Sequence, residues 1–377
     1  MTPERARPRL PVAAPSLIGN EERYVVDAIR SSWIASTGSY VDRFEREFAA
    51  MCGTRAAVSA VNGTAALHLA LVALGLGPGD EVIVPSLTYV ATANAVRYAG
   101  AEPVFVDIEP SSWCIDPTEV EAAVTSRTRG IIPVHLYGHP ADMDSLTAIA
   151  SRHRLWIVED AAESHGAEYR GRPTGSLGTV GVFSFYGNKI VTSGEGGALT
   201  VDDPDILARI RLFRGQGMDP VHRYYFPVIG YNYRLTNVAC AILCAQLERF
   251  HEIVQARQRV FDGYRNRLER VPGIGFQPVA SWATPAPWLF CISVNAVEFG
   301  ASRDELAVAL DMAGIETRPF FRPLHTLPPY MNARKGALTT TVDVAASGMN
   351  LPTFAALTDS DLDRVAETIR GAQRPRS

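Results

Sequence analysis

Residues 81 to 106 read EVIVPSLTYVATANAVRYAGAEPVFV, and this stretch decides the fold. It begins and ends with short apolar runs rich in β-branched residues, Glu81 to Val84 and Pro103 to Val106. Between them, from Thr88 to Tyr98, apolar residues recur at helical spacing. A strand, a crossover helix and a second strand of these lengths form a βαβ unit with parallel strands. The stretch therefore predicts an α/β fold with a parallel or mostly parallel sheet.

The same alternation continues on both sides of this stretch. Helical periodicity and apolar runs predict helices at residues 64–74, 117–125 and 143–153 and strands at residues 130–134, 155–158 and 180–185. These runs recur at roughly the spacing that one crossover helix needs. The sequence therefore predicts one sheet with helices packed on it.

The C-terminal third has a different pattern. Residues 236–271 predict one long helix, and the chain closes with a capped amphipathic helix that begins at Thr358. We place a domain boundary within the long helix, near residue 250. We expect a large domain at residues 1–250, with a Pro-rich N-terminal arm, and a smaller domain at residues 251–377.

The composition excludes several classes of protein. The 377 residues are 47% hydrophobic and 20% charged, which excludes collagen-like, disordered and coiled-coil chains. The formal net charge is −4 and both signs alternate along the chain, so we expect no nucleic-acid partner. No apolar run approaches the ~20 residues of a membrane span, and the first residues lack a signal peptide's apolar core. The five cysteines form no Cys-x-x-Cys pair, so we expect buried thiols and a cytoplasmic location.

Two candidate catalytic residues follow predicted strands, where ligands bind in open α/β sheets. The strand at residues 155–158 leads directly into Glu159 and Asp160, although a helix cap or a surface acid explains this carboxylate equally well on its own. The strand at residues 180–185 leads into Lys189 and a glycine-rich turn. A lone lysine is more often a surface residue, and its spacing is not that of a P-loop.

Two binding features lie at the same predicted sheet edge. Asn62-Gly-Thr64 precedes an apolar helix, so its backbone N–H groups and hydroxyl can hold an anion, with simple helix capping as the alternative. Tyr89 offers an aromatic face, although most such tyrosines only pack. Gly75 to Gly79 lacks the spacing of a dinucleotide fingerprint, and the histidines show no metal-ligand spacing, so no metal is expected.

Together, these features match what pyridoxal 5′-phosphate (PLP) requires. A lysine forms an imine with this cofactor, and an acid keeps the pyridine nitrogen protonated so that the ring can accept electrons. An aromatic side chain stacks on the ring, and a helix N-terminus holds the phosphate. Each feature is weak alone, but the ordered set indicates a PLP enzyme.

The sequence also resembles the DegT/DnrJ/EryC1/StrS family of sugar aminotransferases, which are fold-type-I PLP enzymes. The resemblance covers nearly the whole chain and implies a three-layer large domain with a mostly parallel sheet and a smaller α+β C-terminal domain. It is carried by six stretches: SWIASTG at 32–38, NGTAALHLA at 62–70, GDEVIVPSLTY at 79–89, EDAAESHG at 159–166, SFYGNK at 184–189 and GYNYRLTN at 230–237.

The resemblance implies two catalytic residues and two neighbours of the cofactor ring. Lys189 would be the Schiff-base lysine and proton shuttle, and Asp160 would pair with the pyridine nitrogen. Tyr89 would stack on the ring. Glu163 would lie near the phenolic oxygen of the cofactor, where many family members carry Gln or His.

The resemblance also implies how the phosphate is held and how the subunits combine. Gly63, Thr64 and Ser184 would bind the phosphate. Asn232 would be contributed by the neighbouring subunit, which implies an obligate homodimer with shared sites.

Within the family, residues 187–189, 223–234 and 318–330 look most like perosamine synthases and related 4-aminotransferases. This similarity implies that L-glutamate donates an amino group to a nucleotide-linked 4-keto-6-deoxyhexose, giving a 4-amino-4,6-dideoxy sugar nucleotide. His325, from the small domain, and Arg223 would lie on the substrate side, with a packed histidine and a surface arginine as the alternatives.

Three other functions are alternatives for this sequence. A 3-keto sugar nucleotide or a cyclitol is the alternative acceptor. A PLP-dependent sugar dehydratase of the same family carries His in place of the lysine, which disfavours it here because residue 189 is Lys. A non-catalytic sensor is disfavoured because Asp160, Lys189 and Asn232 are all retained.

Overall fold

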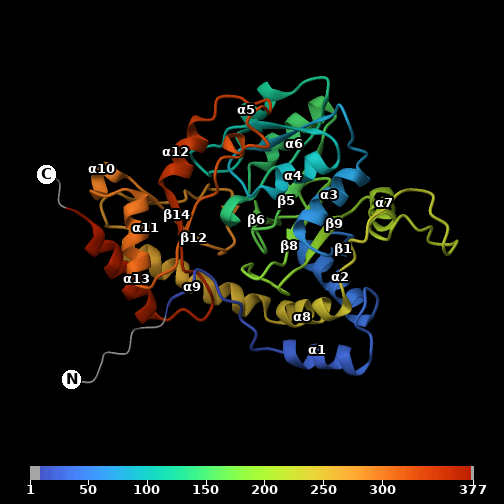
Figure 1. Cartoon of the computed structure of the whole chain (residues 1–377), viewed down its shortest axis with the longest axis horizontal. Coiled ribbons are helices and arrows are strands. Elements are labelled where there is room, and N and C mark those ends of the chain that lie inside the picture. Colours follow the sequence, from blue (N-terminus) through green and yellow to red (C-terminus); the bar gives the residue numbers. More distant parts are fainter. Residues whose placement is uncertain (1–8, 375–377) are drawn as a thin grey trace.

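The βαβ unit expected at residues 81–106 is present in the computed structural model, which describes residues 9–374 (Figure 1). It consists of strand β2 (Glu81–Pro85), helix α4 (Ala91–Tyr98) and strand β3 (Glu102–Val106). The two strands pair in parallel, with Glu81 opposite Glu102. The helix begins at Ala91 rather than Thr88, so Thr88 and Tyr89 stay in the loop that follows β2.

This unit belongs to a seven-stranded sheet that is parallel except for one strand. The strand order is β1-β9-β8-β5-β4-β2-β3, and only β9 runs antiparallel to both of its neighbours. The expectation of a mostly parallel sheet is confirmed. The five strands beyond the βαβ unit are β1 (Ala56–Ala60), β4 (Thr128–Ile131), β5 (Trp156–Asp160), β8 (Val180–Ser184) and β9 (Gly197–Val201).

Helices cover both faces of this sheet, which gives three layers. Along β2, Val82 and Val84 pack in one hydrophobic cluster, while Ile83 between them packs in another. This alternation follows from the two-residue period of a strand. The first cluster includes side chains of α3 (Gly63–Ala73), α4 and α7 (Pro204–Arg214); the second includes side chains of α2 (Ser39–Cys52), α5 (Pro117–Ala123) and α6 (Met143–His153).

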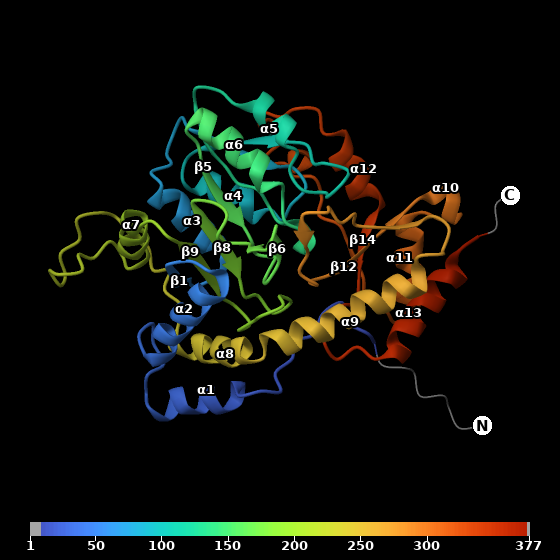
Figure 2. The same cartoon turned by 180° about the vertical axis from the view of Figure 1, so that it is seen from behind.

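The long helix expected at residues 236–271 is two helices. They are α8 (Asn237–Glu248) and α9 (Phe250–Leu268), separated at Arg249. Helix α8 packs on α1 (Glu21–Arg30) and α2, whereas α9 packs on α13 (Asp359–Ala372), as Figure 2 shows from behind. On the basis of these contacts, we propose that the boundary between the large and the small domain lies near residue 250.

The C-terminal part is built on a second sheet, with order β10-β12-β14-β13 and all pairs antiparallel. In Figure 1 it lies beside the larger sheet, with α9 below. Its elements are β10 (Ile274–Phe276), β12 (Phe290–Val294), α10 (Ala296–Phe299), α11 (Arg303–Met312), β13 (Arg318–Pro319), α12 (Thr339–Ser347), β14 (Gly348–Leu351) and α13. A three-stranded sheet, β11 (Ala283–Thr284), β6 (Glu168–Tyr169) and β7 (Arg172–Pro173), joins the two parts of the chain.

Two segments cross between the parts. Near the start of the chain, Leu10 bridges to Ile315, in the small part. A segment of the C-terminal part packs on the large part: its side chains Leu324, Tyr330 and Leu338 belong to the core cluster of α3 and α4. The core of the large part is therefore completed by residues far along the chain. Among residues 9–374, no helix combines the length and apolar content needed to cross a bilayer.

Candidate active site

A cavity of about 470 Å³ lies where β2, β5 and β8 end and β13 and β14 approach. Most of the residues expected to bind the cofactor line it. These are Gly63, Thr64, Tyr89, Asp160, Glu163, Ser184 and Lys189. The larger sheet therefore brings together side chains that are more than 100 residues apart in the sequence, as expected for strand ends on one edge of a sheet.

Lys189 lies in the turn after β8, and its backbone N–H donates to the carbonyl of Tyr186 at 2.9 Å. Its Nζ lies 3.9 Å from the centre of the Trp288 ring. Within residues 9–374, no carboxylate forms an ion pair with this amine. Burial lowers the pKa of Lys189, and the charges of Glu163 and Asp160 oppose this shift in part. The amine is therefore easier to deprotonate, as a nucleophile and proton carrier requires.

Asp160, the last residue of β5, is buried and lines the cavity. Its carboxylate accepts hydrogen bonds from Thr92 Oγ1 at 2.7 Å and from the backbone N–H of Ala162 at 3.3 Å. Burial raises the pKa of Asp160, and these hydrogen bonds and Lys189 lower it in part. A buried carboxylate is stabilised by a cation. Across the described part of the chain, no cationic side chain lies within ion-pair distance of Asp160.

Glu163 is also buried and lies three residues after Asp160, in the loop that follows β5. Its Oε2 accepts a hydrogen bond from the backbone N–H of Tyr137 at 2.7 Å. Burial raises the pKa of Glu163 to about 7, and the nearby charge of Lys189 opposes this shift. Near neutral pH the side chain can therefore be protonated, in which form it donates a hydrogen bond as a glutamine does.

The N-terminus of α3 and the end of β8 form an anion-binding cradle. Asn62 caps the helix by accepting from the N–H of Ala65 at 2.8 Å. The N–H groups of Gly63 and Thr64 have no acceptor within the helix, because they lie in its first turn. A Cβ atom at Gly63 would lie 2.8 Å from Cβ of Ser184, so glycine permits this close approach. The cradle offers N–H groups and two hydroxyls to a phosphate.

Aromatic side chains line the mouth of the cavity. Tyr89 is 58% exposed, and its ring centre lies 5.8 Å from that of Phe321. Phe321 stacks in turn on Tyr137, with centres 5.5 Å apart. A flat aromatic ligand can stack against such exposed ring faces.

These features fit PLP. The primary amine of Lys189 is free to form an imine, and a protonated ring nitrogen would supply the cation that Asp160 lacks. The cradle at Gly63 matches a phosphate in charge and hydrogen-bond donors. No group of three His, Cys, Asp or Glu side chains within residues 9–374 is arranged to hold a metal ion.

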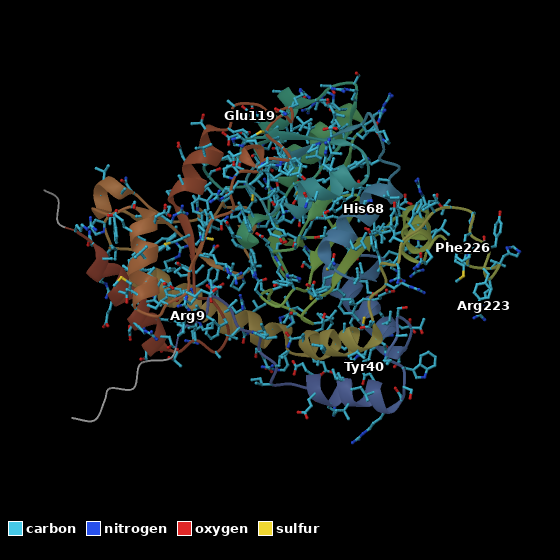
Figure 3. All side chains as sticks on the ribbon, in the orientation of Figure 1. Arg9, Tyr40, His68, Glu119, Arg223 and Phe226 are labelled. Atoms are coloured by element: carbon cyan, nitrogen blue, oxygen red, sulfur yellow. The ribbon has the colours of Figure 1, made fainter. Side chains whose placement is uncertain are left out.

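Three expected site residues do not line this cavity. His325 Nδ1 lies 2.7 Å from Ser86 Oγ, beside the end of β2. Asn232 is exposed and bridges to Gly215 in the backbone. Arg223 is exposed on the loop between α7 and α8, which projects from the molecule in Figure 3.

Six residues of the C-terminal part line the cavity and are not identified by the sequence alone: Trp288, Leu289, Arg318, Pro319, Phe321 and Asn350. Arg318 and Phe321 lie in a stretch that carries the resemblance to 4-aminotransferases, but the stretch alone does not show which of its side chains reaches the cavity. Trp288 and Asn350 lie outside the motifs. Only the packing of the two parts of the chain reveals their place.

A larger hollow, of about 700 Å³, lies at the N-terminus of α2. Trp33 and Gly38 of the motif at residues 32–38 line it, together with Arg214 and Asn237. Neither Lys189 nor Asp160 reaches it. The chemistry of the side chains, rather than the volume, therefore makes the smaller cavity the candidate active site.

The fold and this cavity define a PLP-dependent aminotransferase. Residues 15–370 match the DegT/DnrJ/EryC1/StrS aminotransferase family, and the chain belongs to this family.

Named relatives are similar over almost their whole length. GDP-perosamine synthase of Caulobacter vibrioides is 49% identical, with 95% of this chain and 96% of the relative covered. The structure of DesI with its TDP-sugar product is 36% identical, with a TM-score of 0.92 and coverage of 98% of this chain and 94% of DesI. Spr1654 of Streptococcus pneumoniae, solved in its PLP-form, is 28% identical, with a TM-score of 0.89 and coverage of 97% and 98%.

Proposed function

We propose that this enzyme transfers the amino group of L-glutamate to C4 of a nucleotide-linked 4-keto-6-deoxyhexose. The products would be 2-oxoglutarate and a 4-amino-4,6-dideoxy sugar nucleotide. The Cα of glutamate is oxidised to a ketone while C4 of the sugar is reduced to an amine, so no further oxidant or reductant is needed. The name of the Caulobacter relative, GDP-perosamine synthase, and the TDP-sugar product bound to DesI support a sugar nucleotide as acceptor.

The observation that carries the proposal is the shared cavity of Lys189 and Asp160. When bound, PLP holds the amino group between the two substrates and stabilises negative charge at the carbon that loses its proton. Asp160 would hold the ring nitrogen in its protonated form. Lys189 Nζ would take a proton from Cα of the donor and deliver one to C4 of the acceptor, and its lowered pKa suits both steps.

The other lining residues would bind and orient the cofactor. Gly63, Thr64 and Ser184 would hold the phosphate at the N-terminus of α3. Tyr89 would cover one face of the ring. Glu163 in its protonated form would donate a hydrogen bond to the phenolic oxygen.

The assembly that we propose is a homodimer in which Asn232 enters the cavity of the neighbouring subunit. The loop before Asn232 supports this assembly, because Val221 is 81% exposed and Ile229 is 90% exposed, and Tyr224, Tyr225 and Phe226 are also exposed. Exposed apolar side chains in this number mark an interaction surface. Phe226 and Arg223 project with this loop in Figure 3.

On the substrate side, we propose Arg223 of the neighbouring subunit and His325 as contacts of the sugar nucleotide. Arg223 would provide a cation for the diphosphate. His325 is fixed by Ser86, next to the loop that carries Tyr89. We also propose a cytoplasmic location, which the five free and buried cysteines support, since thiols persist in a reducing compartment.

The test compares acceptors with the amino donor held constant. The enzyme is incubated with PLP, L-glutamate and either the 4-keto or the 3-keto isomer of GDP- and TDP-linked 6-deoxyhexoses, and NMR locates the new amine. We expect amine at C4, because a shift of ~1 Å in the position of the reacting carbon can cost ~10²-fold in rate. Lys189→Ala serves as the inactive control. Amine only at C3, or on a cyclitol alone, would contradict the proposed acceptor.

A further inference from the structure

We propose that Tyr137 is a positioning residue that holds the carboxyl group of Glu163 in place for the cofactor and connects it to the C-terminal part of the chain. The inference rests on the proposed function, in which Glu163 donates a hydrogen bond to the phenolic oxygen of PLP. Tyr137 is buried in a short 3-10 helix between β4 and α6, η1 (Leu136–Gly138). It does not itself line the cavity, so it would act through Glu163.

Tyr137 presents its backbone N–H to Glu163 in a left-handed conformation. Its φ is 53° and its ψ is 28°, a region that residues with a side chain rarely adopt. In this conformation the N–H donates a hydrogen bond of 2.7 Å to Glu163 Oε2. Such backbone strain persists only where the surrounding structure holds it, and it clusters at functional sites. The strained conformation therefore points to a role for this N–H group.

The hydrogen bond from Tyr137 orients the carboxyl group of Glu163. Among residues 9–374, no other donor lies within hydrogen-bond distance of this group. Because Oε2 accepts from Tyr137, the proton of the neutral acid is left to Oε1. Oε1 is then the atom that can donate to a ligand in the cavity, which Glu163 lines. The bond therefore decides which oxygen of Glu163 would serve the cofactor.

The ring of Tyr137 is held by the C-terminal part of the chain. Its centre lies 5.5 Å from that of Phe321, 4.7 Å from that of Phe320 and 6.2 Å from that of Trp288. Tyr137 Oη also accepts a hydrogen bond of 3.3 Å from the backbone N–H of Phe321. Both Phe321 and Trp288 line the cavity. Tyr137 therefore connects the aromatic side chains of the cavity with Glu163.

The residues on either side of Tyr137 are also fixed. The N–H of His135 donates to the carbonyl of Asp160 at 3.1 Å, so the segment runs beside the end of β5. The carbonyl of Gly138 accepts from the N–H of Ala286 at 3.0 Å. Gly138 has a φ of 93°, and a Cβ atom there would lie 2.1 Å from the carbonyl oxygen of Ala286. Only glycine suits this position, and the segment thus connects Asp160 with the C-terminal part.

Removal of the Tyr137 ring should release Glu163. Tyr137→Leu loses the aromatic contacts and the hydroxyl group that hold the residue in place. Leucine tolerates a positive φ no better than tyrosine does, so the backbone should relax once its anchor is gone. The N–H would then leave Glu163 Oε2, and the carboxyl group would lose its fixed orientation.

The test follows the absorbance of the PLP-loaded enzyme as a function of pH, without substrates. Lysine-bound PLP changes colour as it loses a proton, and a hydrogen bond donated to its phenolic oxygen moves the pH midpoint of that change. Glu163→Ala removes this donor and should move the midpoint by roughly one pH unit. We expect Tyr137→Leu to move it in the same direction, by about half as much or more. The double variant should match Glu163→Ala alone, because both changes remove one interaction.

Tyr169→Leu is the matched control. Tyr169 is buried in the same hydrophobic cluster as Tyr137, and its hydroxyl donates a hydrogen bond to Asp142. This variant therefore loses a comparable ring at a distance from Glu163, and its midpoint should equal that of the unmodified enzyme. Tyr137→Phe keeps the ring and loses only the hydroxyl, so we expect a smaller shift than in Tyr137→Leu. It takes the place of the leucine variant if that protein does not fold.

Three outcomes would overturn the assignment. The first is an unchanged midpoint in Tyr137→Leu, or in Tyr137→Phe where it takes the place of the leucine variant. The second is a shift that adds in full to that of Glu163→Ala, since the two residues would then act independently. The third is an unchanged midpoint in Glu163→Ala, which would show that Glu163 does not reach the phenolic oxygen. Failure of the proposed function is distinguishable, because the unmodified enzyme would then transfer no amine from L-glutamate to a keto sugar.

Discussion

The indole of Trp288 contacts the amine of Lys189 and also the backbone of the residue before it. Nζ of Lys189 lies 3.9 Å from the ring centre, and Nε1–H of Trp288 donates a hydrogen bond of 2.9 Å to the carbonyl of Asn188. Trp288 is buried just before β12, so it belongs to the C-terminal part of the chain. The position of the lysine therefore depends on contact between the two parts.

Trp288→Phe should lower kcat by about tenfold while the enzyme keeps its cofactor. The change removes the hydrogen bond to Asn188 and weakens the cation–π contact, which together amount to roughly 1–2 kcal/mol. Steady-state kinetics and the cofactor's absorbance check both parts of this prediction. If kcat were unchanged, Trp288 would contribute packing alone.

Asp160→Asn should slow turnover by orders of magnitude and affect cofactor affinity less. The amide keeps the shape of the side chain and can still accept from Thr92, but it loses the charge that we propose keeps the ring nitrogen protonated. The measurements are kcat and the dissociation constant for PLP. Equal activity of variant and unmodified enzyme would reduce Asp160 to a structural role.

Glu163→Gln should change how stability depends on pH in the cofactor-free protein. The folded state raises the pKa of Glu163 from 4.5 to about 7, so the folded state binds the proton more tightly than the unfolded state does. Stability is therefore lost as pH rises from about 4.5 to 7. Between pH 5.5 and 8 the unmodified protein should lose about 2 kcal/mol of unfolding free energy relative to the variant.

Urea unfolding at the two pH values measures this difference. Glutamine has no titrating group, so the variant reports every other pH effect in the same fold. A parallel pH dependence of the two proteins would show that Glu163 is ionised throughout this range.

Mixing two inactive variants should restore activity if Asn232 enters the neighbouring site. A heterodimer of Lys189→Ala and Asn232→Ala subunits has one site free of both changes. Random exchange of equal amounts should therefore yield up to about a quarter of the unmodified activity. Each variant alone is the control. Heterodimers that form but stay inactive would place the whole site within one chain.

Much of the fold could be predicted because its signals are local. Five strands of the larger sheet and the helices α3 to α6 follow from apolar periodicity. Strand β1 (AAVSA) was not predicted because small residues give little periodic signal, and β9 was not predicted for a similar reason. The sequence does not indicate the break at Arg249, because apolar periodicity continues across it.

The candidate site likewise contains residues that local sequence patterns indicate and residues that they do not. Asp160, Lys189 and the cradle at Gly63 lie next to the strands and helix that position them, so sequence order indicated them. Trp288 and Arg318 reach the cavity through the packing of the smaller sheet, which no local pattern encodes. The family resemblance includes residues 318–330, but only the fold shows that Arg318 lines the cavity.

The return of Leu324, Tyr330 and Leu338 to the core of α3 and α4 has a consequence for protein synthesis. A nascent chain that has just emerged through residue 250 contains every strand of the larger sheet. It still lacks these three side chains, so part of the apolar surface of α3 and α4 stays exposed to water until translation nears its end. The ribosome must therefore almost finish the polypeptide before PLP meets a complete binding site.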